Sequence, residues 1–276
     1  EVKVALSGDG ADELFCGYER YLAIRYASRL SLLPEALSRP LISPLAALFS
    51  DGGERTRSGR MRRFLRVTAS PEKLRYFTLI NRCDTALKNS LFGVKLRSAL
   101  ERNSAELFDS LQWELSSADP IERLSELDQR TYLPGDILTK VDIASMAASL
   151  EVRSPFLDRE VVEFAARLPL GYKLHGGRRK HILIEAFRDI LPPEIAARPK
   201  KGFGVPVAAY LRGEWHNLAE QALFDGKLAT DGYFQKLTIR RLWKEHQSGR
   251  RDHSYLLWSL LIFSLFLENN HRGVEV

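Results

Sequence analysis

The chain has 276 residues, of which 45% are hydrophobic and 28% are charged, so it carries enough apolar residues for a packed core. Its longest apolar run, LLWSLLIFSLFL from Leu256 to Leu267, spans 12 residues. That length excludes a membrane-spanning helix and fits a buried one. Cys16 and Cys83 lie far apart without metal-ligand spacing, which excludes a disulfide framework or zinc site and predicts a reduced, cytoplasmic protein.

The formal net charge is +6, and much of the excess lies in one segment, ERTRSGRMRRFLR. A basic patch of this kind can bind nucleic acid, or it can be the solvated face of a helix. No recognised nucleic-acid module surrounds the segment, so the helix face is favoured and no nucleic-acid partner is expected. A phosphate-rich substrate would also tolerate the positive charge. The arginines of this segment are Arg55, Arg57, Arg60, Arg62, Arg63 and Arg66.

The first predicted element is a short buried strand, VKVALS, over Val2 to Ser7. A helix is expected to begin near Glu13, after the GDGAD turn. Prolines at 34, 40 and 44 predict that helices in this stretch are short or start late. A flexible polar loop, DGGERTRSG, follows.

From Met61 onward the apolar periodicity predicts helices, with prolines 71 and 120 in first turns. The segment GDILTKVDIASMAASLEVR is apolar on most faces and predicts a buried helix or helix pair. RRKHILIEAFRDIL predicts an amphipathic helix that ends at Pro192 and Pro193. A loop, RPKKGFGVP, and two C-terminal helices complete the chain. The helical segments in the first group are MRRFLRVT, PEKLRYFTLINRC, SAELFDSLQWEL and PIERLSELDQRTYL.

A single strand in a helical chain cannot satisfy its edge hydrogen bonds or bury both faces by itself. We therefore expect further strands from upstream sequence, so that the chain is the C-terminal part of a longer protein. The predicted fold class is α/β, mostly helical over these residues, with one or two strands.

The stretch SGDGADE presents backbone N–H groups where a strand opens into a helix, which favours an anion such as phosphate. Gly8 and Gly10 allow the backbone to approach a ligand closely. The neighbouring carboxylates Asp9, Asp12 and Glu13 would suit a phosphate site if Mg²⁺ lay between. Alternatively, these acids simply stabilise the start of the helix.

Two further stretches carry charges in unusual places. An apolar segment carries three charged residues at spacings near one helical turn: Asp136, Lys140 and Asp142. Charges in such a segment need partners or a function, so these residues form either a functional group or a structural ion-pair network. Lys200 and Lys201 precede a Gly-Phe-Gly loop, where they could be solvated or could reach a negatively charged intermediate.

Together these stretches resemble the synthetase domain of the glutamine-dependent asparagine synthetases. The matching segments are LSGDGADELFCGY, LPGDILTKVDIASMAASLEVRSPFLD and RPKKGFGVPVAAYLRGEW, in family order, and the similarity covers nearly the whole chain. The resemblance implies an adenine-nucleotide α-hydrolase-like (ATP pyrophosphatase) domain, of which residues 1–276 would be the C-terminal portion. It also implies ATP and Mg²⁺ as cofactors.

The implied reaction has two steps. The β-carboxylate of aspartate attacks the α-phosphate of ATP to give β-aspartyl-AMP and pyrophosphate, and ammonia then displaces AMP. In the family, an N-terminal glutaminase domain makes the ammonia from glutamine. The resemblance places Ser7, Gly8 and Gly10 at the nucleotide and pyrophosphate site.

The resemblance also assigns roles to charged residues. Asp9 matches a carboxylate near the reacting centre, Asp12 matches a Mg²⁺ ligand, and Asp136 matches a carboxylate on the ammonia-facing side. Lys200 matches a lysine that holds the developing charge on phosphate. Arg153 and Asp158, in EVRSPFLD, are expected to be mostly structural.

Two features depart from the family pattern. The pyrophosphate loop Ser-Gly-Gly-x-Asp-Ser and an N-terminal catalytic cysteine do not occur in these residues, so the chain alone is expected to bind ATP poorly. Cys16 replaces a usually small residue in LFxGY and is not expected to be that nucleophile. Lys201 stands beside Lys200, and register favours Lys200.

Other interpretations stay open at this point. The acceptor could be a different carboxylate, in polysaccharide or secondary-metabolite biosynthesis, because residues that select aspartate lie partly upstream. The chain could instead be a non-catalytic binding module that lost the phosphate loop. A homodimer is possible on either view.

Overall fold

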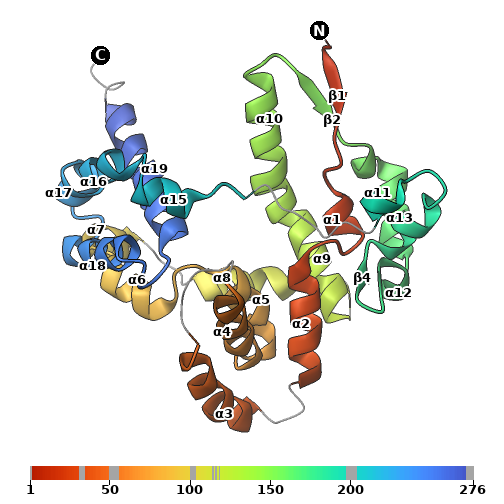
Figure 1. The fold of residues 1–276 in the computed structure, drawn as a ribbon, viewed down its shortest axis with the longest axis horizontal. Helices are drawn as coiled ribbons and strands as arrows, with labels where there is room; N and C mark the ends of the chain where they lie inside the picture. The colour runs from red at the N-terminus through yellow and green to blue at the C-terminus, as the bar shows by residue number, and fades with distance from the viewer. Residues whose placement is uncertain are drawn as a thin grey trace. The chain divides into compact units, whose positions relative to one another are not determined.

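Two compact units make up the chain in the computed structural model: Glu1–Leu32 with Leu107–Lys201, and Leu33–Glu106 with Gly202–Val276. The structure describes residues 2–30, 35–49, 56–99, 104–113, 115, 117, 119–196 and 204–271. Figure 1 shows that helices dominate both units. This agrees with the predicted mostly helical α/β class. None of the described helices is long and apolar enough to cross a membrane.

The first unit is built around a parallel pair of strands. Strand β1 (Val4–Leu6) pairs with β2 (Glu151–Arg153), with Val4 opposite Glu151 and Leu6 opposite Arg153. The predicted first strand is therefore present, but its described partner comes from the EVR segment of this same chain. An additional two-stranded antiparallel pair, β3 (Leu174–His175) with β4 (Arg178–Arg179), was not predicted.

Helices and helical turns connect these strands. Helix α1 begins at Ala11, after the turn that follows β1, so the predicted start near Glu13 lies within it. The elements are α1 (Ala11–Leu14), α2 (Glu19–Leu30), α8 (Ser104–Trp113), α9 (Pro120–Arg130), the π-helical turn η2 (Leu133–Leu138), α10 (Thr139–Met146), the 3₁₀ turn η3 (Pro155–Leu157), α11 (Arg159–Arg167), α12 (Leu170–Lys173), α13 (His181–Ala186) and α14 (Pro193–Ala196).

Burial in the first unit corrects two expectations. Strand β1 was expected to be buried, but Val4 is 42% and Leu6 is 74% exposed. The segment from Gly135 to Arg153 was expected to be a buried helix or helix pair. Its first part is helical, in η2 and α10, and its end forms β2, but it is not buried, because Ile143 and Met146 are more than half exposed. Both elements thus present apolar side chains at the surface of the described first unit.

The predicted helix over Arg178 to Leu191 is also shorter than expected. Gly176 and Gly177 both have positive φ, and they turn the chain so that Arg178 and Arg179 form β4. Lys180 then adopts a left-handed conformation, and α13 begins only at His181. A local turn that glycine makes accessible therefore overrides the helical periodicity of the first residues.

The second unit is entirely helical in its described residues apart from one isolated bridge between Phe92 and Phe234. Helix α3 continues through Pro40 and Pro44, although these prolines were expected to shorten helices here. Each proline removes one backbone donor, and the remaining turns hold the helix. The helices are α3 (Glu35–Ala47), α4 (Arg57–Thr68), η1 (Glu72–Leu74), α5 (Arg75–Ile80), α6 (Thr85–Leu91), α7 (Val94–Ala99), α15 (Val207–Arg212), α16 (His216–Phe224), α17 (Lys227–Thr230), α18 (Lys236–Gln247) and α19 (Ser254–His271).

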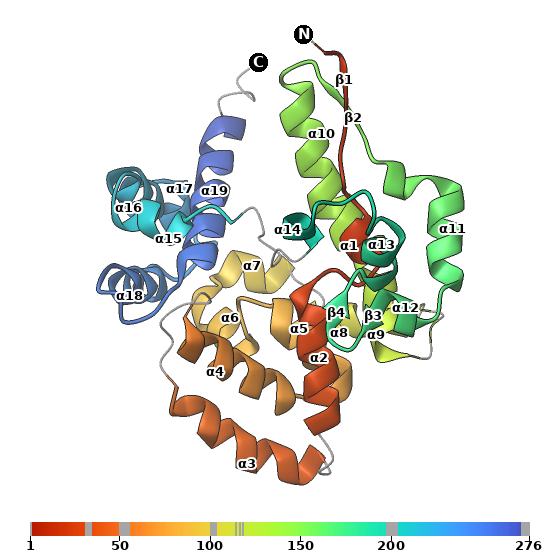
Figure 2. The ribbon, with the colours of Figure 1, turned by 45° about the vertical axis from the view of Figure 1, so that its right-hand side comes forward.

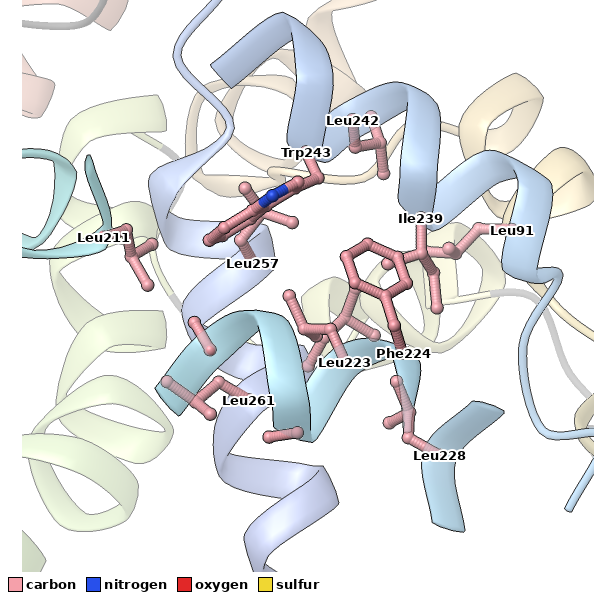
Figure 3. Close-up of a cluster of buried hydrophobic side chains, with 13 residues drawn as sticks. Leu91, Leu211, Leu223, Phe224, Leu228, Ile239, Leu242, Trp243, Leu257 and Leu261 are labelled. Atoms are coloured by element: carbon pink, nitrogen blue, oxygen red, sulfur yellow. The ribbon is translucent and has the colours of Figure 1, made fainter. Parts of the chain in front are cut away.

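Five helices, rather than the two predicted, follow Gly204. Figure 2 shows α15, α16 and α17 beside α19, which they contact. The apolar segment Leu256–Leu267 lies in α19 and is buried at Leu257, Leu260 and Leu261, as predicted. Figure 3 shows these helices contributing to one apolar cluster: Leu91, Leu211, Ala219, Ala222, Leu223, Phe224, Leu228, Ile239, Leu242, Trp243, Leu257, Leu260 and Leu261.

The arginine-rich segment forms α4, in which Arg57, Arg60 and Arg66 are exposed, whereas Arg62 and Arg63 are half-buried. Thr56 caps this helix by accepting a hydrogen bond from the backbone N–H of Gly59. The interpretation of a solvated helix face therefore fits Arg57, Arg60 and Arg66, whereas Arg63 donates a hydrogen bond to the Leu79 carbonyl. Arg55 lies outside the described residues.

A buried histidine joins α15, α18 and the loop before α19. His246 is 0% exposed, and the backbone N–H of His253 donates to its Nδ1 at 3.3 Å. Arg212 Nε donates to the backbone oxygen of His246 at 2.8 Å. Burial, and next the charge of Arg212, lower the pKa of His246 to about 4, although Asp252 opposes this shift. The ring is therefore neutral in the folded protein at neutral pH.

We predict that His246 makes the second unit sensitive to acid. The unfolded chain takes up a proton near pH 6.5 and the folded chain only near pH 4, so stability is lost as the pH falls through this window. From pH 7.5 to pH 5 the loss attributable to His246 is about 2 kcal/mol. Denaturant unfolding followed by tryptophan fluorescence reads this unit, since Trp215, Trp243 and Trp258 belong to it.

His246→Gln should lose about 2 kcal/mol less than the wild type over the same pH change. The partly exposed His216, changed to Gln, is the matched control and should follow the wild type. Parallel pH dependences for the wild type and His246→Gln would contradict the prediction.

Candidate functional site

Two serines meet at the carboxyl ends of the parallel strands. Ser7 follows β1 and Ser154 follows β2, and their Oγ atoms lie 2.9 Å apart. Ser7 Oγ donates to Asp9 Oδ2 at 2.8 Å, while the Ser7 N–H donates to the Arg153 carbonyl at 2.9 Å. Ligands bind at the carboxyl ends of strands in open parallel sheets. Ser7, Asp9 and Ser154 therefore form a half-buried polar group at the carboxyl ends of the strands, where a ligand is expected.

Sequence analysis missed Ser154, because EVRSPFLD was interpreted as mostly structural. A signal was present: each strand, VAL and EVR, is followed directly by a serine. The structural part of that interpretation holds for Asp158, which caps α11 by accepting a hydrogen bond from Glu160 N at 2.9 Å. Arg153 pairs with Glu151 at 2.7 Å on the exposed side of β2.

Gly10 fixes the turn between β1 and α1. It is the N-cap residue of α1 with φ 89°, it is buried, and no side chain caps this helix start. A Cβ atom at Gly10 would overlap the side chain of Leu157, whereas one at Gly8 would have nothing within 4 Å. Asp9 therefore does not act as a helix cap, and Gly10 is required by both conformation and space.

Asp12 forms an ion pair with a residue far along the chain. Its side chain is 17% exposed, and Lys180 Nζ lies 3.0 Å from Asp12 Oδ1. A Cβ at Gly17 would overlap both Asp12 Oδ1 and Lys180 Cε, so glycine is needed beside the pair. Lys180 was not among the predicted site residues.

Glu13 points into the unit, away from this ion pair. It is 1% exposed, and Tyr18 donates a hydrogen bond to Glu13 Oε1 at 2.5 Å. Burial raises the pKa of Glu13, and burial together with the Glu13 hydrogen bond raises the pKa of Tyr18. Ser125 on α9 donates to the backbone oxygen of Glu13 at 2.5 Å. These contacts fix α1 against α9.

Aromatic rings continue this network to Asp136. Tyr18 and Tyr132 meet edge to face with centroids 5.8 Å apart, and Asp136 is close enough to influence the pKa of Tyr132. Burial, and next the Asp136 charge, raise the pKa of Tyr132. Asp136 itself is exposed in η2. The structure thus links two of the sequence-identified acidic positions, Glu13 and Asp136, through two tyrosines.

A guanidinium group lies over both rings. Arg20 sits 3.9 Å from the Tyr18 centroid and 4.5 Å from the Tyr132 centroid, and its Nη2 lies 2.9 Å from Asp128 Oδ2. Asp128 is 1% exposed and also accepts a hydrogen bond from Tyr21 at 2.5 Å. Arg20 therefore joins the aromatic pair to a buried carboxylate.

The remaining predicted charges are not gathered here. Within the described part of the chain, Asp136, Lys140 and Asp142 form no ion pair with one another, so the network alternative finds no support. Lys200 and Lys201 lie outside the described residues. Cys16 is buried, and burial raises the pKa of its thiol to about 12, which agrees with its exclusion as a nucleophile.

Few protein side chains are available to coordinate a metal ion in this site. Among the described residues, no group of three or more His, Cys, Asp or Glu side chains could hold a metal ion. Mg²⁺ commonly takes only one or two carboxylates and completes its shell with water and substrate phosphates. The ammonium of Lys180 already stands as a cation on Asp12 Oδ1, so this oxygen fits a positive charge.

Comparison with known proteins identifies the family. A family model described as Asparagine synthase matches residues 1–268. The chain belongs to the asparagine synthase family. No solved structure matches it.

Members of this family in several organisms are similar to the chain. Asparagine synthetase [glutamine-hydrolyzing] 1 of Bacillus subtilis is 31% identical over 265 residues, which cover 96% of this chain and 40% of that protein. A Mycobacterium tuberculosis protein, provisionally named as a glutamine-hydrolysing asparagine synthetase, is 36% identical over 96% of this chain and 39% of its own length. The human asparagine synthetase is 28% identical over 49% of this chain and 27% of its own. The chain thus spans about two fifths of the length of the first two relatives.

We predict that Gly10 cannot be replaced without loss of stability. Gly10→Ala combines a strained φ with an overlap on Leu157 and should lower the free energy of unfolding by about 3 kcal/mol. Gly8→Ala, in the same turn, is the matched control and should stay within about 0.5 kcal/mol. Chemical unfolding followed by circular dichroism gives both values, and hydrogen exchange locates the loss in α1. Equal stability of the two variants would show that the turn adapts.

Proposed function

We propose that this protein takes part in ATP-dependent amide formation, converting aspartate to asparagine. A carboxylate oxygen of aspartate attacks the α-phosphorus of ATP, and pyrophosphate leaves with the electron pair of the broken P–O bond. Ammonia then attacks the acyl carbon of β-aspartyl-AMP, AMP leaves, and one proton is lost. The observation that carries the proposal is the polar group of Ser7, Asp9 and Ser154 at the carboxyl ends of β1 and β2, in a chain of this family.

The proposed roles follow the geometry of the turn. Ser7, Gly8 and Gly10 would approach the nucleotide and pyrophosphate, since this turn offers a hydroxyl and backbone N–H groups without a bulky side chain. Asp9, held by Ser7, would lie near the reacting carboxylate. Asp136 would accept the proton released when neutral ammonia attacks, because it is exposed and lies near Tyr132.

Asp12 is the residue we propose to hold Mg²⁺. The bound ion would neutralise charge on the pyrophosphate oxygens. Lys200, by its resemblance to the family lysine, would stabilise the negative charge that develops on the phosphate during adenylation.

The proposal includes partners and a larger fold. The two units would together be the C-terminal portion of a synthetase domain of the adenine-nucleotide α-hydrolase type, since the relatives are more than twice as long as their matched part. Further strands would then pair beside β1 and extend the sheet. A glutaminase domain would supply ammonia, and a homodimer and a cytoplasmic location complete the proposal.

The product ratio of the full-length natural protein tests the reaction. With ATP, Mg²⁺, aspartate and glutamine, we expect AMP, pyrophosphate and asparagine in equal amounts, and ammonium salts should replace glutamine. Formation of ADP and phosphate instead would exclude adenylation. AMP formation with another carboxylic acid but not with aspartate would redirect the proposal to that substrate.

We predict that Lys200 and its neighbour differ in this assay. Lys200→Ala should lower the rate of pyrophosphate release by about a hundredfold or more, since it removes charge stabilisation at the transferring phosphate. Lys201→Ala removes the same charge one residue away and should keep most of the rate. Near-normal turnover in Lys200→Ala would remove the lysine from the mechanism.

We predict a separate effect for Asp12→Asn. The Mg²⁺ concentration for half-maximal turnover should rise by about tenfold or more. Loss of a residue that only hydrogen-bonds to a metal ligand already weakens metal binding by about that factor, and Asp12 is proposed as a ligand itself. A Mg²⁺ titration of turnover at saturating ATP measures it. If the titration is unchanged, Asp12 is only the structural partner of Lys180.

A further inference from the structure

Lys180 is held in an unusual backbone conformation beside Asp12. It is one of three described non-glycine residues with positive φ, at 52°, and its backbone N–H donates to the Phe15 carbonyl at 3.1 Å. Lysine gains nothing intrinsic from the left-handed region, which glycine or asparagine would adopt more easily. In this conformation the Lys180 side chain reaches Asp12.

The surroundings of the ion pair are built to fit it. The Gly17 N–H donates to the Asp12 backbone oxygen at 2.8 Å, and Arg179 donates to the Gly17 carbonyl at 3.2 Å. Any side chain at Gly17 would displace either Asp12 or Lys180. The Asp12 and Lys180 side chains are 17% and 29% exposed, so solvent screens this pair less than a surface ion pair.

We propose that Lys180 is a positioning residue that acts as the resident counter-ion of Asp12 and competes with the divalent cation for it. This inference rests on the proposed role of Asp12 in binding Mg²⁺. Because Lys180 Nζ lies 3.0 Å from Asp12 Oδ1, a metal ion at that oxygen must displace the ammonium group. The displaced ammonium then needs another anion.

The consequence is a coupling between metal and anion. A divalent cation alone meets repulsion from Lys180 and binds weakly. A divalent cation that arrives with a polyphosphate supplies the replacement anion for the ammonium group in the same event. Lys180 thereby favours the metal–pyrophosphate or metal–nucleotide complex over the bare ion.

The first measurement is the affinity of the full-length protein for Mn²⁺ alone, read from the electron paramagnetic resonance signal of unbound Mn²⁺. Lys180→Met keeps the aliphatic stem and the backbone requirement but removes the charge. It should bind Mn²⁺ about tenfold more tightly, which is the size of a single like-charge repulsion even in a water-like dielectric. Arg178→Met removes an exposed charge two residues away and should bind like the wild type.

The second measurement adds inorganic pyrophosphate. In the wild type, pyrophosphate should increase Mn²⁺ affinity by a larger factor than in Lys180→Met, because only the wild type has an ammonium group to satisfy. Lys180→Arg, which keeps the charge, should behave like the wild type. Thermal unfolding of every variant shows that it is folded, and Lys180→Gln replaces Lys180→Met if the latter is not.

Two outcomes separate this inference from the proposed function. Equal Mn²⁺ affinity of the wild type and Lys180→Met, or no binding by either, overturns the competition. If Lys180→Met binds tightly but adding Asp12→Asn leaves that binding unchanged, the ion does not sit on Asp12. The metal role in the proposed function then fails together with this inference, whereas equal affinities leave that role intact.

Discussion

The parallel pairing of β1 with β2 is the constraint on which the candidate site depends. Only three residue pairs are joined, but the pairing brings together segments almost 150 positions apart in the sequence. Because the strands run parallel in this register, both loops that follow them leave from the same end of the sheet. Ser7 and Ser154 therefore meet, and Asp9 accepts a hydrogen bond from one of them. A shift of one residue would turn these side chains to the opposite face.

Helix α1, which follows the carboxyl end of β1, places two neighbouring carboxylates in chemically different environments. Asp12 and Glu13 are adjacent in the sequence, yet successive helical residues point about 100° apart. Asp12 consequently reaches Lys180, whereas Glu13 enters the buried network with Tyr18. Gly10 sets the direction of the helix because only glycine fits its φ and the close approach of Leu157. One short helix thus separates a carboxylate that meets a cation from a carboxylate that is buried.

Sequence patterns predicted the elements whose causes are local. The strand at VKVALS, the helix that starts at Pro120 and the buried apolar helix α19 are of this kind, whereas Pro71 precedes the 3₁₀ turn η1 and lies outside it. Ser154 and Lys180 could not be assigned in the same way, because their roles arise from contacts across 147 and 168 positions. The exposure of α10 could not be predicted either, since periodicity shows which face is apolar and not what covers it. The roles of Asp9, Asp136 and Lys200 stay predictions.

Buried polar contacts act beside apolar packing in the first unit. Around α1, one described cluster has Leu14, Phe15 and Ala165 as buried members, and Leu124 and Leu127 of α9 are also buried. Hydrogen bonds from Tyr18, Tyr21 and Ser125 add specificity to this packing, because they are directional and each ends on a buried acceptor. Loss of one of these donors leaves a buried carboxylate or carbonyl without a hydrogen bond, which costs free energy. This cost favours a single placement of α1. Buried polar contacts therefore act together with apolar packing to place α1, which carries Asp12 to its partner Lys180.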